Sequence, residues 1–240
     1  VNDRGKDITL LDKTKSFLIF YTTKFLNHED NDSDFDLSEK INTKFTNLFN
    51  SYDEIKRIGD EKNINYVQRQ KFSEDDLLAF FYHHFKKYAN EKYPLEGYDY
   101  DIKAEDVYEE VIKEGCNLLR EDKKKAIEFV EDIIESLEDV TKSFESILTN
   151  SENNEKIEEL IRMQNPNIRT YHLLVSAKAS GKLDEELIEI IRVLNMRLYR
   201  IANSRARASL YKRAAAVFKK GKSKKERSEE RRVGKECVSE

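Results

Sequence analysis

The chain has 240 residues and a formal net charge of −4, with 38% charged and 38% hydrophobic residues. Its longest purely apolar run covers residues 17–21, which is far too short to cross a bilayer, and its two cysteines provide no disulfide framework. These values exclude a membrane-spanning or disulfide-stapled class. They favour a soluble helical protein of the cytoplasm with no membrane partner.

The charge is distributed unevenly along the chain. Residues 190–226, called here the basic arm, contain twelve basic residues and one acid, which gives a net charge of +11. The last fourteen residues are balanced, so the first 189 residues carry a net charge of −15. An acidic body with a basic arm indicates which partners the chain can bind rather than how it folds.

The first two predicted helices have clear boundary signals. Thr9 is an N-cap candidate with Asp12 three residues later, and one apolar face carries this helix to about Leu26. A second helix is expected over residues 37–58, where apolar side chains recur every three or four positions. Gly59 then occupies the C′ position that ends it.

The third predicted helix is the most aromatic part of the chain. It covers residues 73–91, with Ser73 as its N-cap and Asp76 as the capping partner, after a short connector over residues 60–71. Aromatic residues on nearly all of its sides predict a central, buried helix. Two further helices are expected over residues 104–119 and 122–148.

A polar break at residues 151–154 is the predicted boundary between two helical regions, residues 8–150 and 151–226. The second region should contain helices at residues 155–163, at 166–179 with Gly181 closing it, and from Asp184 onward, ending in a basic helix near Lys220. We find no strand pattern or repeat. The predicted fold class is all-α, a multi-helix antiparallel assembly with long helices and a disordered C-terminal tail.

The last fourteen residues form that tail. Residues 227–240 resemble the conceptual translation of a short-read sequencing adapter, with a natural charged tail as the alternative. They have no apolar period, so we expect no packing there and assign them no function.

A turn precedes the first helix. Asn2, Asp3 and Gly5 are turn-forming residues, and the chain passes through Arg4 and Lys6 before the helix begins. A guanidinium and an ammonium group are common partners of phosphate. A plain turn at a helix start explains these residues equally well.

This turn and helix resemble the junction in GmrSD-type restriction proteins. In that family a ParB/sulfiredoxin-like N-terminal domain with an Asp-Gly-Gln-Gln-Arg motif hydrolyses nucleotide and carries a second motif. In that motif a Phe is followed by three residues and an Asn, then by a turn and a helix. Asn2 stands at the Asn position, and the Phe would precede residue 1. The resemblance spans roughly residues 1–220, with further matching segments at residues 64–66, 72–78, 165–166 and around Arg200.

The resemblance implies a fragment of a longer protein. Residues 1–7 would be the truncated end of the nucleotide-binding domain, with Asn2, Arg4, Gly5 and Lys6 near its cofactor-binding site. The parent would use a nucleoside triphosphate and a divalent metal, whereas the fragment itself would hold no cofactor. A His-Asn-His nuclease would follow in the parent, so the missing domains are the expected partners.

No catalytic or metal-binding residue is predicted within the chain. His83 and His84 are adjacent on a helix and point about 100° apart, so regular geometry does not bring both to one metal. We expect one to pack among aromatic residues and the other to be partly exposed. Of the paired acids, Asp76 is interpreted as a cap, and Asp75, Glu109 and Glu110 as solvated helix faces.

The basic arm is the stronger functional signal, because a helix rich in cations binds phosphate backbones through counterion release. Docking of the arm on the acidic body is the competing interpretation. The candidate nucleic-acid-binding residues are Arg197, Arg200, Arg205, Arg207, Lys212 and Arg213.

Two hypotheses for function follow. The first is that the chain is the helical middle of a GmrSD-like phage-defence protein. It would connect a nucleotide-hydrolysing domain to a nuclease that cuts modified DNA. The fragment would be inactive alone and would contact DNA through the arm. The alternative is a non-enzymatic helical module that binds DNA or another protein. The sequence does not determine the oligomeric state.

Overall fold

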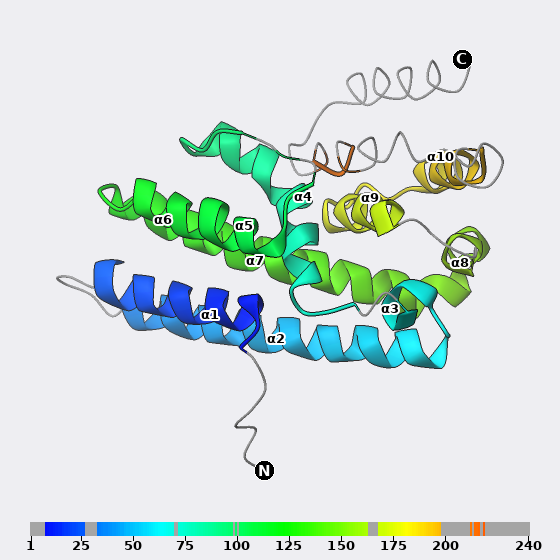
Figure 1. The fold of residues 1–240 in the computed structure, drawn as a ribbon, viewed down its shortest axis with the longest axis horizontal. Coiled ribbons are helices and arrows are strands. Elements are labelled where there is room, and N and C mark those ends of the chain that lie inside the picture. The colour runs from blue at the N-terminus through cyan, green and yellow to red at the C-terminus, as the bar shows by residue number, and fades with distance from the viewer. Residues whose placement is uncertain are drawn as a thin grey trace, which may run out of the picture.

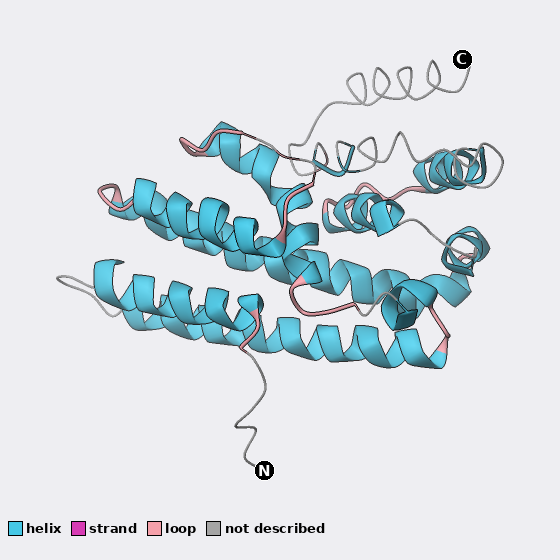
Figure 2. Cartoon of the chain, viewed as in Figure 1, coloured by secondary structure: helices cyan, strands magenta, loops and turns pink. Residues whose placement is uncertain are grey.

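The computed structural model describes residues 8–26, 33–69, 72–97, 99, 101–162, 168–197, 212, 214–216 and 218. These residues are overwhelmingly helical, and no strand occurs among them (Figure 2). The predicted all-α class is therefore confirmed. Within the described ranges no helix is both long enough and apolar enough to span a bilayer. The predicted tail at residues 227–240 lies outside the described residues.

Two long helices, α2 (Ser33–Glu61) and α7 (Lys123–Thr149), lie side by side, with α7 in the middle of the molecule (Figure 1). The two helices run parallel to each other, since contacts join them near their starts and again near their ends. Lys40 Nζ lies 2.8 Å from Glu131 Oε1 near the start of the pair. Lys62 Nζ donates to the Leu148 carbonyl at 3.0 Å near its end. Chain neighbours such as α6 and α7 run antiparallel (Figure 1).

Helix α1 (Leu10–Tyr21) continues through a π-helical turn at Thr22–Leu26 and lies along α2 (Figure 1). The Asp12 N–H donates to Thr9 Oγ1 at 3.1 Å, so the predicted N-cap is confirmed. The predicted span to Leu26 is also confirmed, with a wider final turn.

The predicted end of α2 at Gly59 is wrong, because the helix continues to Glu61. Asn63 adopts the left-handed conformation, with φ of 52°, and the Ile64 N–H donates to the Gly59 carbonyl at 2.8 Å. This is a Schellman C-cap in which asparagine takes the place usual for glycine. Gly59 is needed for packing, since a Cβ there would lie 2.3 Å from Val67 Cγ1 on the short helix α3 (Asn65–Arg69).

Helix α4 (Asp76–Lys92) is the central buried helix that its aromatic content predicts. It begins three residues later than predicted, although the Ser73 N–H and hydroxyl both donate to Asp76 Oδ2, at 2.7 and 3.0 Å. Helix α4 runs antiparallel to α7, with ring contacts that advance in opposite directions along the two helices. The ring centroids are 5.2 Å apart for Phe80–Phe144 and 6.0 Å apart for Phe85–Phe129.

The predicted helix over residues 104–119 is confirmed, with a π-helical middle. It comprises α5 (Ala104–Asp106), a π-helical segment (Val107–Lys113) and α6 (Glu114–Leu118). The hydroxyl of buried Tyr21 donates to the Cys116 carbonyl at 2.6 Å. This bond pairs a carbonyl in the last turn of α6 and fixes α6 against α1.

The last helices cover one side of α4 and α7. They are α8 (Glu155–Arg162), α9 (Ile168–Ala179) and α10 (Glu185–Asn195). Gly181, with φ of 63°, closes α9 as predicted, and Asp184 caps α10 by accepting from the Leu187 N–H at 2.8 Å.

A 3₁₀ turn at Asn150–Asn153 coincides with the predicted boundary near residue 151. The hydrophobic core continues across this turn. Tyr171 of α9, which is 1% exposed, stacks on Tyr66 with ring centroids 5.1 Å apart and packs against Phe144 of α7 at 5.4 Å.

Candidate functional site

The residues that the resemblance places beside a nucleotide, Asn2, Arg4, Gly5 and Lys6, lie outside the described residues. The first described residue is Ile8, and it is 67% exposed. Hydrogen bonds at Thr9, Leu10 and Leu11 fix the start of α1.

Two acids from the turn before α4 hold the start of α1. Asp75 Oδ1 accepts from the Leu10 N–H at 2.8 Å and from the Leu11 N–H at 3.3 Å. Glu74 Oε2 lies 3.0 Å from the hydroxyl of Thr9, the N-cap residue. Carboxylates near the N-terminus of a helix satisfy unpaired N–H groups and interact favourably with the helix dipole.

Asp75 is therefore a helix cap and not the solvated acid that the sequence predicts. It caps a helix 65 positions away in the chain, and no local pattern signals such a contact. Glu109 is exposed, as predicted, and lies 2.5 Å from Lys113 Nζ.

Three histidines lie between α4 and α9. The side chains of His83, His84 and His172 are 1%, 2% and 4% exposed, so the expectation that one of the first two is partly exposed is wrong. The cause is α9, which covers the side of α4 that would otherwise face solvent. His83 and His172 meet edge to face with ring centroids 4.8 Å apart.

His84 and Ser176 superficially resemble a nucleophile and its base, with Nδ1 2.9 Å from Oγ. The Ser176 hydroxyl, however, donates its hydrogen to the Ala215 carbonyl at 2.6 Å, so the imidazole must donate to the serine oxygen. A base has to accept that proton, and both groups are buried. The pair fastens residue 215 to the body.

His83 is held neutral. Burial, and next the positive charge of Lys212, lower the pKa of His83 to about 3, although Asp101 opposes them. Among the described residues, no three His, Cys, Asp or Glu side chains are arranged to hold a metal ion. The buried rings of His83 and His172 pack against each other, and His172 also packs on Phe80 with ring centroids 4.2 Å apart.

The described part of the basic arm beyond residue 211 is docked on the body. Lys212 Nζ lies 3.1 Å from Asp101 Oδ1, and the Lys212 side chain is 13% exposed. Ala215, Ala216 and Phe218 are buried, and Lys182 Nζ donates to the Phe218 carbonyl. Of the other predicted DNA-binding residues, Arg197 is exposed, and Arg200, Arg205, Arg207 and Arg213 lie outside the described residues.

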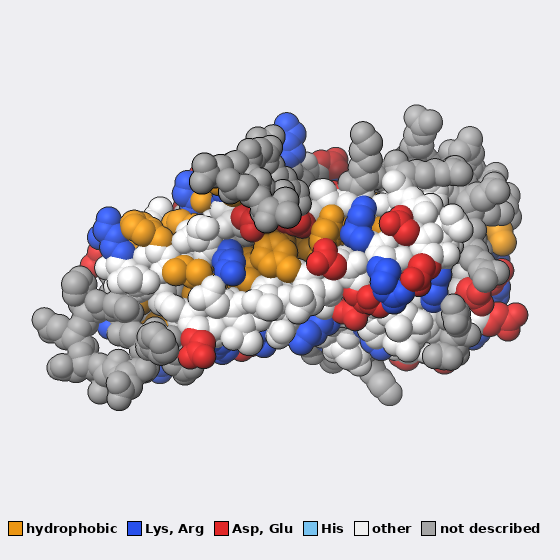
Figure 3. Space-filling view, turned by 90° about the horizontal axis from the view of Figure 1, so that it is seen from below, with side chains coloured by type: hydrophobic (Ala, Val, Ile, Leu, Met, Phe, Trp, Pro, Cys, Tyr) orange, Lys and Arg blue, Asp and Glu red, His pale blue; other side chains and the backbone are white. Residues whose placement is uncertain are grey.

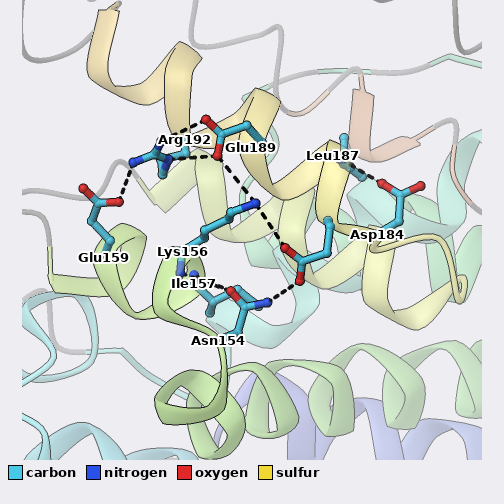
Figure 4. A network of polar contacts seen from close by, with 9 residues as sticks. Asn154, Lys156, Ile157, Glu159, Asp184, Leu187, Glu189 and Arg192 are labelled. Atoms are coloured by element: carbon cyan, nitrogen blue, oxygen red, sulfur yellow. Dashed lines mark hydrogen bonds and ion pairs between the residues drawn. The ribbon is translucent and has the colours of Figure 1, made fainter.

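The first cation of the arm is also engaged with acids. Arg192 of α10 forms ion pairs with Glu159 of α8 at 2.7 Å and with Glu189 at 2.9 Å (Figure 4). Lys156 joins the same network, 3.3 Å from Glu185, and ties α8 to α10. The guanidinium charge of Arg192 is thus balanced within the body.

A buried carboxylate that sequence reasoning missed clamps α2 to α7. The Glu138 side chain is 5% exposed and accepts hydrogen bonds from Lys44 and, at 2.8 Å, from Asn47. Burial by itself raises the pKa of Glu138, but the hydrogen bonds from Lys142, Lys44 and Asn47 outweigh it and lower the pKa to about 2. One feature of the sequence could have indicated the burial of Glu138, namely its place directly after Leu137 in the apolar stripe of α7.

Comparison with protein-family models, with curated proteins and with solved structures found no match to this chain.

Proposed function

We propose that this chain is the helical connector of a GmrSD-type restriction protein from a prokaryotic cytoplasm. In the parent, a preceding domain would hydrolyse a nucleoside triphosphate with a divalent metal, and a following nuclease would cut modified DNA. The proposal rests on the resemblance of the junction, and the anchoring of the start of α1 is the structural observation that supports it.

A connector has to hold the domains that it joins at fixed positions, and the start of α1 is suited to this role. Its N-terminal turn is tied by Asp75 and Glu74 to the turn that begins the central helix α4. A domain that precedes residue 8 in the parent would therefore be attached to a point that is fixed on the bundle, and the segment that joins it would follow Ile8. The exposed side chain of Ile8 gives that segment an apolar surface to cover.

DNA contact is a separate part of the proposal. Arg192 and Lys212 are paired with acids, so contact with phosphate is assigned to the remaining candidates. These are Arg197, Arg200, Arg205, Arg207 and Arg213. A non-enzymatic module that binds DNA or protein remains the alternative function.

The experiment measures nucleotide turnover and duplex DNA binding by the purified full chain. We expect no turnover with any nucleoside triphosphate and Mg²⁺. We expect DNA binding that weakens steeply between about 50 and 200 mM salt. Arg197→Glu should weaken it, whereas the matched charge reversal Lys124→Glu, at an exposed lysine in the first turn of α7, should not. Absence of DNA binding at low salt would contradict the role of the arm, and turnover would contradict the connector.

A further inference from the structure

An exposed group of aromatic and cationic side chains lies where α1 and α6 end together. We call Phe20, Lys24, Phe25, Leu118 and Arg120 the aromatic corner. The bond from Tyr21 to the Cys116 carbonyl joins the two helices here. Phe20 and Leu118 are each 53% exposed, and the described residues contain only two other exposed large hydrophobic side chains. Figure 3 shows apolar side chains beside Lys and Arg side chains at this end of the molecule.

The rings of the aromatic corner hold its cations in place. Lys24 Nζ lies 5.0 Å from the centre of the Phe20 ring and 5.2 Å from that of Phe25. The guanidinium carbon of Arg120 lies 4.0 Å from the centre of the Phe25 ring. Phe20 and Phe25 in turn meet edge to face at 6.2 Å. Cation–π attraction of this kind restricts two long side chains that would otherwise be free to rotate.

The two cations of the corner contact aromatic rings rather than carboxylates of the described residues. Lys113, on the helix that leads into α6, differs in this respect, because it pairs with Glu109 at 2.5 Å. Within the described ranges, neither Lys24 nor Arg120 forms an ion pair with an Asp or Glu. The corner therefore presents two positive charges held on aromatic rings, together with the exposed apolar side chains of Phe20 and Leu118.

We propose that the aromatic corner docks an acidic peptide segment of a partner protein that carries one aromatic or aliphatic anchor. Carboxylates of the segment would pair with Lys24 and Arg120, and the anchor would cover Phe20 and Leu118. Apolar anchors supply most of the binding energy at such surfaces, and complementary charges supply specificity and orientation.

The surroundings favour a short peptide over a nucleic acid or a membrane. Nucleic acids and anionic bilayers are bound through many cations at once, and the corner offers two. The first 189 residues carry a net charge of −15, so a long polyanion would be repelled by the rest of the body. A segment of few residues meets only the corner itself.

The test measures fluorescence anisotropy of a labelled peptide, Asp-Asp-Phe-Asp-Asp-Ser-Asp, titrated with the full chain at about 50 mM salt. We expect saturable binding that Lys24→Glu weakens about tenfold, and that Phe20→Ser weakens by a similar factor. Lys13→Glu is the matched control, because Lys13 is an exposed cation on the same helix outside the corner, and it should leave the affinity within about twofold. Unchanged thermal unfolding would show that each variant folds.

Three results would overturn the proposal. One is the absence of peptide binding, and another is equal loss with Lys13→Glu and Lys24→Glu, which would indicate unspecific charge attraction. The third is tighter binding, with the same dependence on Lys24, to a single-stranded oligothymidine or to phosphatidylserine vesicles.

Discussion

The backbone N–H of Leu10 donates to Asp75 Oδ1 at 2.8 Å, so a side chain next to the central helix caps the first helix from 65 positions away. Most N-caps come from the residue just before the helix, and here that residue is Thr9. The second cap makes the start of α1 depend on the position of α4. This dependence gives the proposed connector its rigidity at the junction.

Replacing Asp75 with alanine should destabilise the protein by about 1–2 kcal/mol, because two N–H groups lose their acceptor and the helix dipole loses a nearby carboxylate. Asp75→Asn should cost less, since the amide oxygen still accepts. Chemical denaturation checks both, with Asp53→Ala as a control at an exposed acid of α2. Equal stability of Asp75→Ala and Asp53→Ala would show that the cap contributes nothing.

Glu138→Ala should destabilise the fold by about 3 kcal/mol, because Lys44 and Asn47 lose the acceptor that joins α2 to α7. Glu135 lies on the same helix, is 48% exposed and pairs with Lys40. Glu135→Ala should therefore cost less than about 1 kcal/mol. Urea unfolding of the two variants gives the comparison, and similar losses would contradict a special role for the buried carboxylate.

The Glu138 network also predicts the response to acid. The folded pKa of about 2 lies below the ordinary value of 4.5, so the unfolded chain takes up the proton first as the pH falls. The stability from this group is fully present above about pH 4.5 and is lost as the pH falls toward about 2. Glu138→Gln should flatten the stability profile in that window.

His83 predicts a loss of stability that begins at a higher pH than that of Glu138, and between pH 6.5 and 4.5 it acts without the Glu138 contribution. Its folded pKa of about 3 lies below the ordinary 6.5, so the unfolded state binds the proton first. Stability should fall by up to about 1.4 kcal/mol per pH unit below about 6.5, levelling off near pH 3. His83→Leu should remove this slope without affecting the window of Glu138. Stability measured from pH 7 to 4.5 tests this, and an unchanged slope would contradict the buried neutral state.

Gly59→Ala should destabilise the protein, although this change usually favours a helix interior. The new Cβ would lie 2.3 Å from Val67 Cγ1, and relieving that overlap should cost about 1–3 kcal/mol. Adding Val67→Ala should recover part of the loss, because it removes the clashing methyl groups. A double-mutant cycle measured by thermal unfolding checks the coupling, and simple additivity would show that the contact does not matter.

Local signals in the sequence predicted much of the helical framework. Thr9 is the N-cap that the sequence predicts, because a cap needs only the next three residues. Asp122 and Asp184 stand at the predicted starts of two helices, and each caps its helix. Gly181 likewise ends α9 within its own turn. The Gly59 prediction failed because this glycine is required by the close approach of Val67 and not by the end of the helix.

The candidate sites could be predicted only in part. His84 is buried by α9, and the start of α1 receives its second cap from Asp75. Both contacts join segments that are distant in sequence. The charge of the arm was visible in the sequence, but its pairing partners were not. Asp101 meets Lys212 across 111 positions, a distance at which no periodicity or spacing carries information.

The most direct test of the proposed connector is long-read sequencing of the source locus across both ends of this coding sequence. The account predicts an upstream continuation that encodes a domain with the Asp-Gly-Gln-Gln-Arg motif and supplies the Phe that precedes Asn2 in the split motif. It also predicts that a different downstream sequence replaces residues 227–240. A gene that begins near Val1 and ends at Glu240 would contradict the assignment to GmrSD-type proteins.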